Sequence, residues 1–483
     1  MVYVILSAYL IVVFLSSLQG TRSIGRTPEG YFLANRNVGT LTLFFTILAT
    51  NFSAYYFIGF AGEGYRRGYA FYVIMALGTA LACLSFYLIG DKVWKLGQRH
   101  RYITPGELVR KESDSLALST LVSTIMIVFT LPYLALQIVG AGYLLEVVTE
   151  GQVPYLAGAT LLTAFTIAYV FIGGMTSVAR TDLKQGIIMF GLMLIAVIVI
   201  TQQLGGLTAA NQAVFAQRPE LFDRMGADAY YTPKRWFSWL IFWLFCIPMF
   251  PQIFMRFYIG RTLNHLKRAA IGYAFAPLFL TLLPVIIGVL GHLNHPDLTG
   301  KAADEILPRM LVTHTHPWFA ALIMTGALAA FMSTLDSQLL ALSTIITRDF
   351  WPLFKGKPLD LQGEVQLGKA WVVILALIGL LIAWHPFTTI FDMGKMAFTG
   401  LAMLFPPIFL LLHFRSHFHA TSAIAAILIC ELGVVAFYYE WLSPKWAGGF
   451  EPFIPLLAMS FFLCTIGMCR KKLQAQATTT HSK

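Results

Sequence analysis

The sequence predicts an all-α polytopic membrane protein with about 13 transmembrane helices. Its 483 residues are 57% hydrophobic and only 12% charged, whereas soluble domains usually carry about 25% charged residues. Apolar runs of roughly 20 residues, long enough to cross a bilayer as a helix, recur from end to end. These runs do not alternate apolar and polar residues, as the strands of a membrane barrel do. We therefore expect residues 1–483 to form a single transmembrane domain.

The apolar runs give the order of the spans. The first run lacks a basic segment before it and a convincing cleavage site after it, so we interpret it as a retained span. The loops are short except 205–235 and 294–316, and the five cysteines form no CxxC pair, so neither a zinc site nor a disulfide framework is indicated. The predicted spans lie near residues 1–18, 40–62, 69–94, 116–148, 153–172, 182–204, 236–254, 269–293, 317–346, 368–386, 388–412, 420–441 and 451–469.

The basic residues predict the orientation of the chain. Of the 34 lysines and arginines, 24 fall in the loops after odd-numbered spans or in the tail, nine fall in the other loops, and Lys395 falls within a span. Because Lys and Arg collect on the cytoplasmic side, we expect the amino terminus outside and the carboxyl terminus in the cytoplasm of a plasma (inner) membrane. The net charge of +11 is thus explained by topology, and no nucleic-acid partner is indicated.

Two spans are predicted to be broken. In the second span, the small and polar stretch 49–54 interrupts apolar residues, and in the seventh span Pro248 and Pro251 interrupt a helix rich in Trp and Phe. Interrupted helices five spans apart indicate the binding site of a transporter built from inverted repeats. Ordinary proline kinks and packing glycines are the alternative explanation.

The ninth span carries an unusual polar cluster. Ser333, Thr334, Asp336 and Ser337 fall within five residues of an otherwise apolar segment, and at helical spacing Ser333, Asp336 and Ser337 share one face. A carboxylate at membrane depth is costly unless it meets a partner, a cation or water. Oxygen ligands suit hard cations, so Na⁺ is the expected guest and H⁺ the alternative. Otherwise, the hydroxyls bond to the preceding turn of their own helix and Asp336 pairs with a neighbouring helix.

At these residues the chain resembles the sodium:solute symporter family, which includes sodium/proline, sodium/pantothenate and sialic acid carriers. Three stretches in the right order carry the resemblance: Gly-Tyr-Phe-Leu-Ala at 30–34, Tyr-Val-Phe-Ile-Gly-Gly-Met-Thr-Ser at 169–177 with the following residues through Gln185, and 328–349 around the polar cluster. The resemblance implies a LeuT-type core of inverted five-helix repeats, about 40–204 and 236–412. The helices at 1–18, 420–441 and 451–469 would lie outside this core.

The resemblance also implies two cation sites. The principal sodium site would use the backbone carbonyls of Ala49, Phe52 and Ala330 and the hydroxyls of Ser333 and Thr334. A second site, present in some members, would here use Asp182, Asp336 and Ser337 and would bind either a second Na⁺ or a proton. Alternatively, Asp182 forms a salt bridge with Arg180 or Lys184.

The solute is expected beside the two breaks, near the middle of the membrane. Tyr133 and Trp243 match aromatic positions of the family's proline carriers, but Ile247 and Asn51 replace a tyrosine and an acidic residue of those carriers, which argues against proline. Lys395 would receive the carboxylate of a small organic anion such as a monocarboxylate or pantothenate, or else it pairs with Asp392 near the surface. The candidate solute-binding residues are Asn51, Tyr55, Tyr56, Tyr133, Gln137, Trp243, Ile247 and Lys395.

These observations predict a sodium-coupled secondary active symporter that imports a small organic solute by alternating access. The alternative is a transporter-like membrane sensor that acts through a separate signalling partner. No nucleophile-base pair, metal cluster or phosphate-binding loop indicates an enzyme. The lipid bilayer and the solute are the expected partners, and neither the number of coupled ions nor the oligomeric state follows from the sequence.

Overall fold

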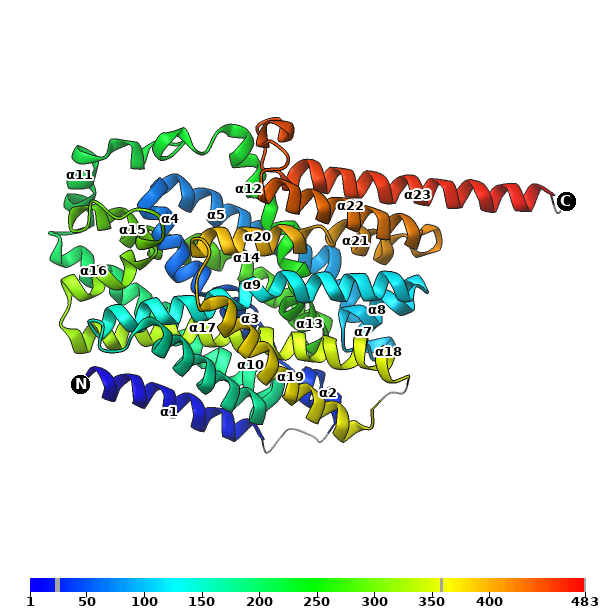
Figure 1. The fold of residues 1–483 in the computed structure, drawn as a ribbon, viewed down its shortest axis with the longest axis horizontal. Coiled ribbons are helices and arrows are strands. Elements are labelled where there is room, and N and C mark those ends of the chain that lie inside the picture. Colours follow the sequence, from blue (N-terminus) through cyan, green and yellow to red (C-terminus); the bar gives the residue numbers. More distant parts are fainter. Residues whose placement is uncertain (22–26, 357–358, 482–483) are drawn as a thin grey trace.

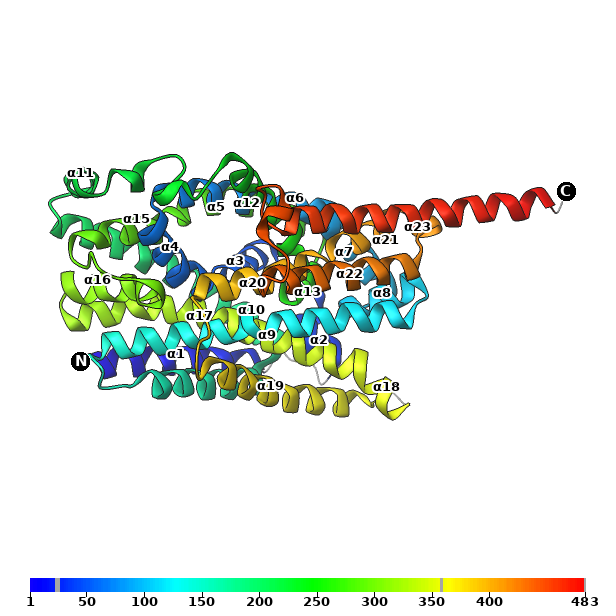
Figure 2. The ribbon, with the colours of Figure 1, turned by 45° about the horizontal axis from the view of Figure 1, so that its top comes forward.

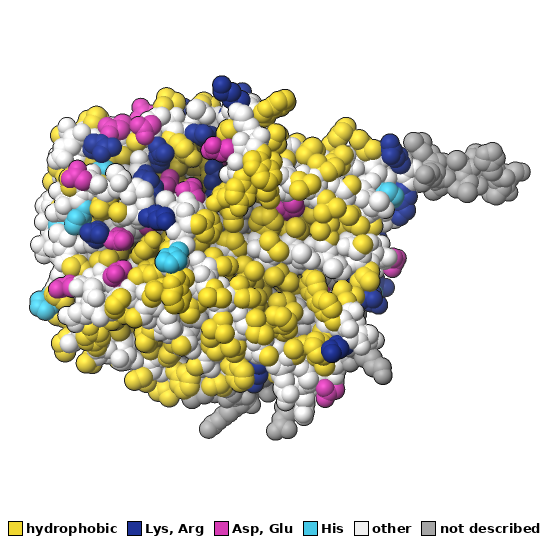
Figure 3. All heavy atoms as spheres, viewed as in Figure 1, with side chains coloured by type: hydrophobic (Ala, Val, Ile, Leu, Met, Phe, Trp, Pro, Cys, Tyr) yellow, Lys and Arg dark blue, Asp and Glu magenta, His cyan; other side chains and the backbone are white. Residues whose placement is uncertain are grey.

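A computed structural model describes residues 1–21, 27–356 and 359–481, and within these ranges the regular structure is helical. Among these described residues, nine helices are long and apolar enough to cross a membrane, or up to eleven if each of two bent pairs counts as one span. Most long helices run roughly along one direction (Figures 1 and 2). On the face shown in Figure 3, hydrophobic side chains cover the middle and charged side chains lie towards the ends, as expected for a membrane-embedded protein.

Both predicted breaks are present. The second span consists of α3 (Thr40–Asn51), a short wider turn at Tyr55–Gly59, and α4 (Phe60–Arg67), with a bend of 56°. The seventh consists of α12 (Pro233–Cys246), a 3₁₀ turn at Ile247–Met249, and α13 (Pro251–Ile259), with a bend of 63°. The second half of this span therefore ends five residues beyond the predicted boundary at 254.

The fifth and sixth predicted spans follow each other without a loop as the two halves of α10 (Tyr155–Gln203). A sharp kink at Gly174 separates the halves. A straight helix of this length would measure about 74 Å, more than twice the hydrocarbon thickness of a bilayer. Gly174 has φ +53°, and a Cβ there would lie 2.6 Å from the ring of Tyr31. Only glycine meets both demands without strain, so this residue separates two consecutive spans.

Helix α17 (Pro317–Ile345) lies at the centre of the structure. Of its most apolar window, 83% is buried inside the protein, against 33% for α22 (Ala420–Tyr438) and α23 (Phe453–His481). A helix that is apolar on all sides is expected in a core. Helix α1 (Val2–Thr21) and the pair α22–α23 lie on opposite sides of the bundle in both views (Figures 1 and 2).

The remaining helices complete the bundle and its connections. They are α2 (Pro28–Leu33), α5 (Tyr69–Leu81), α6 (Cys83–Ser85), α7 (Asp91–His100), α8 (Pro105–Ser113), α9 (Leu116–Val148), α11 (Leu207–Gln217), α14 (Leu263–Leu280), α15 (Leu282–Leu290), α16 (Ile306–His314), α18 (Trp351–Lys355), α19 (Leu361–Ala383), α20 (Ile390–Ala402) and α21 (Phe405–His413).

Candidate functional site

The break in the second span faces the polar cluster of α17. Phe52, directly after α3, has an extended backbone (φ −89°, ψ 90°), so the helix cannot continue and its last carbonyls lose their helical partners. The hydroxyl of Thr334 lies 3.0 Å from the carbonyl oxygen of Thr50 and 3.5 Å from that of Ala49. Carbonyl oxygens of α3 and a hydroxyl of α17 thus converge at the predicted principal site.

Ser333 directly precedes Thr334 on α17. Its hydroxyl is fully buried and lies next to the carboxylate of Asp182. Nearly three turns further along α17, the hydroxyls of Ser343 and Thr344 donate to the carbonyl of Leu340 in their own helix. The alternative expectation for the polar cluster, hydroxyls bonded to the preceding turn, is wrong for Thr334, whose hydroxyl contacts carbonyls of α3.

A buried arginine joins four helices beside this site. The guanidinium of Arg256, on α13, donates to Asp182 of α10 (3.1 Å), Ser337 of α17 (2.6 Å) and Thr46 of α3 (3.0 Å). Thr46 also donates to Asp182, and the side chains of Arg256 and Asp182 are both fully buried. The expected pairing of Asp182 with Arg180 or Lys184 is therefore wrong, because Asp182 lies in the core and faces α13.

Asp336 lies next to this ion pair. Its carboxylate accepts hydrogen bonds from the hydroxyls of Tyr169 (2.7 Å) and Ser337 (3.0 Å), and it is fully buried. Ser337 in turn accepts a hydrogen bond from Arg256, which also donates to Asp182. The two carboxylates are therefore connected through Ser337 and Arg256. Two buried carboxylates and one arginine leave one negative charge, which a proton or a second cation would neutralise.

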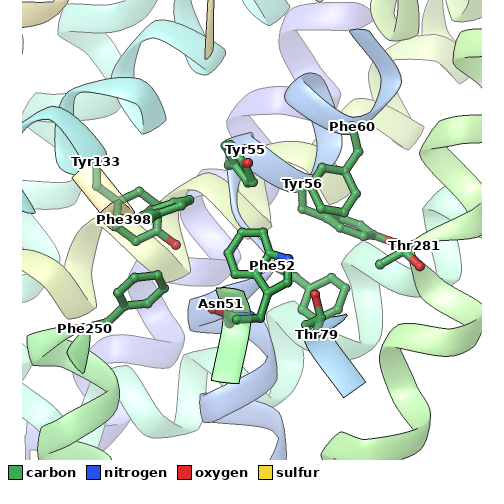
Figure 4. A pocket seen from close by; sticks show the side chains of 11 residues that line it. Asn51, Phe52, Tyr55, Tyr56, Phe60, Thr79, Tyr133, Phe250, Thr281 and Phe398 are labelled. Carbon is green, nitrogen blue, oxygen red and sulfur yellow. The ribbon is translucent and has the colours of Figure 1, made fainter. Parts of the chain in front are cut away.

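A cage of aromatic side chains lies between the two breaks (Figure 4). Phe398 of α20 lies on one side of it beside Tyr133, with its ring centroid 5.0 Å from that of Tyr55, 4.6 Å from that of Tyr133 and 5.7 Å from that of Trp243. The free space among these side chains is about 20 Å³, little more than one water molecule needs. In this conformation the side chains therefore nearly fill the site. The lining residues are Asn51, Phe52, Tyr55, Tyr56, Phe60, Thr79, Tyr133, Trp243, Phe250, Thr281 and Phe398.

Polar groups of the cage are few and uncharged. The amide of Asn51 donates to the hydroxyl of Tyr273, and Tyr56 donates to the carbonyl of Leu280. The hydroxyl of Tyr55 is buried without a partner. An apolar cage with a few hydrogen-bonding groups is typical of a site for a small organic molecule.

Three predicted solute-binding residues do not line this cage. Ile247 is fully buried in the 3₁₀ turn of the seventh span, and Gln137 binds the backbone of the other break. Lys395 forms a salt bridge of 2.7 Å with Glu451 beside a separate cavity of about 500 Å³, which Arg235 also lines. The alternative pair of Lys395 with Asp392 is therefore wrong, and a solute carboxylate at Lys395 stays a prediction.

Comparison with known proteins identifies the family. A family model described as "Sodium:solute symporter family" matches residues 31–430. The chain belongs to this family. The sodium/pantothenate symporter of Escherichia coli K12 is 28% identical over 468 residues, which cover 96% of this chain and 95% of the relative. The osmoregulated proline transporter OpuE of Bacillus subtilis is 26% identical, with coverage of 93% and 90%.

Solved structures agree on the fold. A Na⁺-coupled sialic acid symporter in a substrate-bound outward-open state superposes with a TM-score of 0.79 at 18% identity, covering 98% of both chains. The symporter Mhp1 gives a TM-score of 0.62 at 14% identity, covering 93% of this chain and 95% of that one. The predicted all-α, LeuT-type fold is confirmed.

The protein is a sodium-coupled symporter of a small organic solute and not an enzyme. The relatives named here are carriers, and none supports the alternative of a sensor. The aromatic cage and the oxygens around Thr334 both adjoin the break in the second span.

Sequence reasoning missed two residues of the site. Arg256 was assigned to a loop because the seventh span was ended at 254, although α13 continues to Ile259. Phe398 lies within the predicted eleventh span and is one of 39 phenylalanines, so its residue type alone does not distinguish it. A signal for Phe398 was present in the flanking Gly394 and Gly400, where a Cβ would lie 2.5 Å from the ring of Tyr55 and 2.3 Å from that of Phe129.

Proposed function

We propose that this symporter binds Na⁺ through the carbonyl oxygens of Ala49, Phe52 and Ala330 and the hydroxyls of Ser333 and Thr334. The observation that carries this proposal is the approach of Thr334 to the freed carbonyls of α3. An unwound helix supplies oxygens without a full countercharge, so the ion binds and can still leave. Because α3 and α17 both contribute, the ion holds the broken span against the central helix.

The test is Na⁺-driven uptake by Ser333→Ala/Thr334→Ala. We expect uptake to fall by at least about tenfold, because a buried ion loses two oxygens. Ser343→Ala/Thr344→Ala is the matched control, since these hydroxyls bond only within α17. Uptake by the wild-type protein without Na⁺, or equal effects of the two double variants, would contradict the proposed site.

Asp336, with Asp182 and Ser337, is proposed as the second cation site. Arg256 already balances one carboxylate, so we expect one additional proton or Na⁺, held chiefly by Asp336. Asp336→Asn should change the Na⁺ Hill coefficient or the pH profile of uptake more than the solute affinity. If Asp336→Asn matches the wild type in both, Asp336 is a structural carboxylate only.

The solute is proposed to bind among Asn51, Tyr55, Tyr56, Tyr133 and Trp243, around Phe398. No charged side chain lines this cage, so a charged group of the solute would depend on backbone dipoles and on the neighbouring Na⁺. Pantothenate and proline are the first solutes to test, because two relatives carry their names. Thermal shifts of the purified protein with each solute, in Na⁺ and in K⁺, would show which one binds.

We also propose the orientation predicted from the loop charges, with the amino terminus outside a plasma (inner) membrane and the carboxyl terminus in the cytoplasm. Core repeats at about 40–204 and 236–412, with peripheral helices 1–18, 420–441 and 451–469, complete the single domain. The opposite positions of the two termini support this topology (Figure 1). Reporter fusions that place both termini on one side would contradict it.

A further inference from the structure

The break in the second span needs partners for its backbone N–H groups. The helix that restarts after the break has the same unpaired amides as any helix amino terminus. Ser53 serves most of them: its side chain accepts from Tyr55 N (3.2 Å), and its carbonyl accepts from Tyr56 N (2.9 Å) and Phe57 N (3.0 Å). The N–H of Ala54 points instead to another helix.

Gln137 of α9 accepts this hydrogen bond. Its Oε1 lies 2.8 Å from Ala54 N, and its Nε2 donates to the carbonyl of Tyr133 at 3.1 Å. The side chain is fully buried. Because each end of the amide has its own partner, a flipped amide would set donor against donor and acceptor against acceptor. The orientation of Gln137 is therefore fixed.

The contact between α9 and the break is close on both sides of this bond. One turn after Gln137, a Cβ at Gly140 would lie 2.7 Å from the Cβ of Ala54. On the opposite side, Thr334 of α17 bonds to the carbonyls that precede the break. The amides after the break thus bind α9, and the carbonyls before it bind α17.

We propose that Gln137 is a positioning residue for Na⁺ coupling, which holds the second-span break in the conformation that presents carbonyl oxygens to the ion. Its action passes through Ala54, and it does not touch the solute, since it does not line the cage. This inference rests on the proposed sodium site. It gives Gln137 a role different from the solute contact expected from the sequence.

The test compares the Na⁺ and solute dependences of Gln137→Leu. Leucine keeps the approximate size of the side chain but leaves the Ala54 amide buried and unpaired. The cost of this unpaired amide corresponds to a loss of about tenfold or more in Na⁺ affinity. We expect the Na⁺ concentration for half-maximal uptake to rise by that factor, while the solute KM at saturating Na⁺ changes less than about threefold. Gln137→Glu keeps the acceptor and should restore part of the Na⁺ affinity.

Thr130→Val is the matched control. Thr130 lies two turns earlier on the same face of α9, is fully buried, and its hydroxyl has no partner. Thr130→Val should leave both the Na⁺ concentration for half-maximal uptake and the solute KM near their wild-type values. As a readout independent of transport, Na⁺ without solute should stabilise purified wild-type protein against heat and should stabilise Gln137→Leu only at higher concentration. If Gln137→Leu does not fold, the same measurement on Gln137→Asn decides, because its shorter side chain cannot keep the 2.8 Å contact with Ala54 N.

The outcomes separate this inference from the proposed function. A raised solute KM with an unchanged Na⁺ requirement would overturn the inference and make Gln137 a solute contact. An unchanged Na⁺ requirement in both Gln137 variants would also overturn it. If Ser333→Ala/Thr334→Ala, measured in parallel, leaves the Na⁺ requirement unchanged, the proposed sodium site itself is wrong.

Discussion

The break in the second span is held by hydrogen bonds from two other helices, whereas the break in the seventh span is specified by prolines. Gln137 and Thr334 bind the backbone on either side of the first break. At the second, Pro251 begins α13 and has no N–H that needs a partner. In the described ranges, no side chain of another helix hydrogen-bonds to the backbone of residues 247–251.

This difference matches what each break exposes. The carbonyls of the proposed sodium site contact Thr334 of α17, and the N–H after the break is bound by Gln137 of α9, so the second-span break responds to movements of those helices. The break in the seventh span is specified by its own prolines, and the aromatic side chains of Trp243 and Phe250 beside it line the cage. We infer that the second-span break chiefly sets sodium affinity and that the seventh-span break chiefly sets solute affinity.

The largest expected effect comes from breaking the link between the two spans. Arg256 on α13 bonds to Thr46 on α3 and to Asp182. Arg256→Met leaves a buried carboxylate without its counter-ion, and loss of one partner of a buried pair costs about 3–5 kcal/mol. We expect a clear fall in the melting temperature of the purified protein, measured by thermal unfolding in Na⁺.

The double variant Arg256→Met/Asp182→Asn isolates the cause of that loss. If the unpaired charge is responsible, removing it should restore most of the stability that Arg256→Met loses. A double variant as unstable as the sum of the two single variants would show that Arg256 and Asp182 act independently, and the link between the spans would have to be carried by Thr46 alone.

Much of this site was accessible from the sequence, and the rest depended on tertiary contacts. The breaks and the hydroxyls of Ser333 and Thr334 have local signals, since polar residues and prolines inside apolar helices are visible in one dimension. The pairing of Asp182 has no such local signal. Its partner Arg256 lies 74 positions away, and only the packing of the helices brings Arg256 to face α10. The partner of Lys395 could not be predicted for the same reason, because Glu451 lies beyond one further span.

The second prediction separates the two breaks by their ligands. Trp243→Ala removes an aromatic wall of the cage, and the loss of one buried aromatic contact costs on the order of 1–3 kcal/mol. We expect solute affinity to fall by roughly tenfold to a hundredfold, with a much smaller change in the Na⁺ requirement. Isothermal binding of solute at fixed Na⁺, and of Na⁺ alone, measures the two constants.

Phe245→Ala is the control for Trp243→Ala. Phe245 lies on the same helix but packs against Phe405 and Phe461, away from the cage. It should reduce stability while leaving solute affinity near wild type. Equal losses of solute affinity in the two variants would mean that α12 affects binding through stability in general, and the assignment of the solute to the seventh-span break would fail.

The smallest expected effect concerns the far end of the second span, where α4 is tied to a loop. Arg66 donates to Asp304 (3.0 Å) and to Glu63 (2.7 Å). Asp304, in the 3₁₀ helix Gly300–Glu305, also accepts from the N–H of Ile390 at the start of α20 (2.8 Å). This carboxylate therefore joins α4, the loop and α20 above the cage.

Burial raises the pKa of Asp304 to about 6, against the opposing effect of Arg66. The folded protein thus takes up this proton before the unfolded chain does, whose Asp titrates near about 3.9. The contribution of Asp304 to stability is therefore full below about pH 4 and is lost as the pH rises through about 6. Over the same interval, protonation weakens its ion pair with Arg66.

We expect the initial uptake rate, corrected for Na⁺ affinity, to change by about twofold between pH 7 and pH 5, because protonation of Asp304 weakens its tie to Arg66 on α4. Asp304→Asn keeps the side chain uncharged at every pH, so its rate should match the acidic wild type and lose this pH step. Asp228→Asn, which removes an exposed partner of the neighbouring Arg67, should retain the step. If Asp304→Asn keeps the wild-type pH profile, the tie does not limit movement of α4, and the pH dependence belongs to Asp336 at the other end of the break.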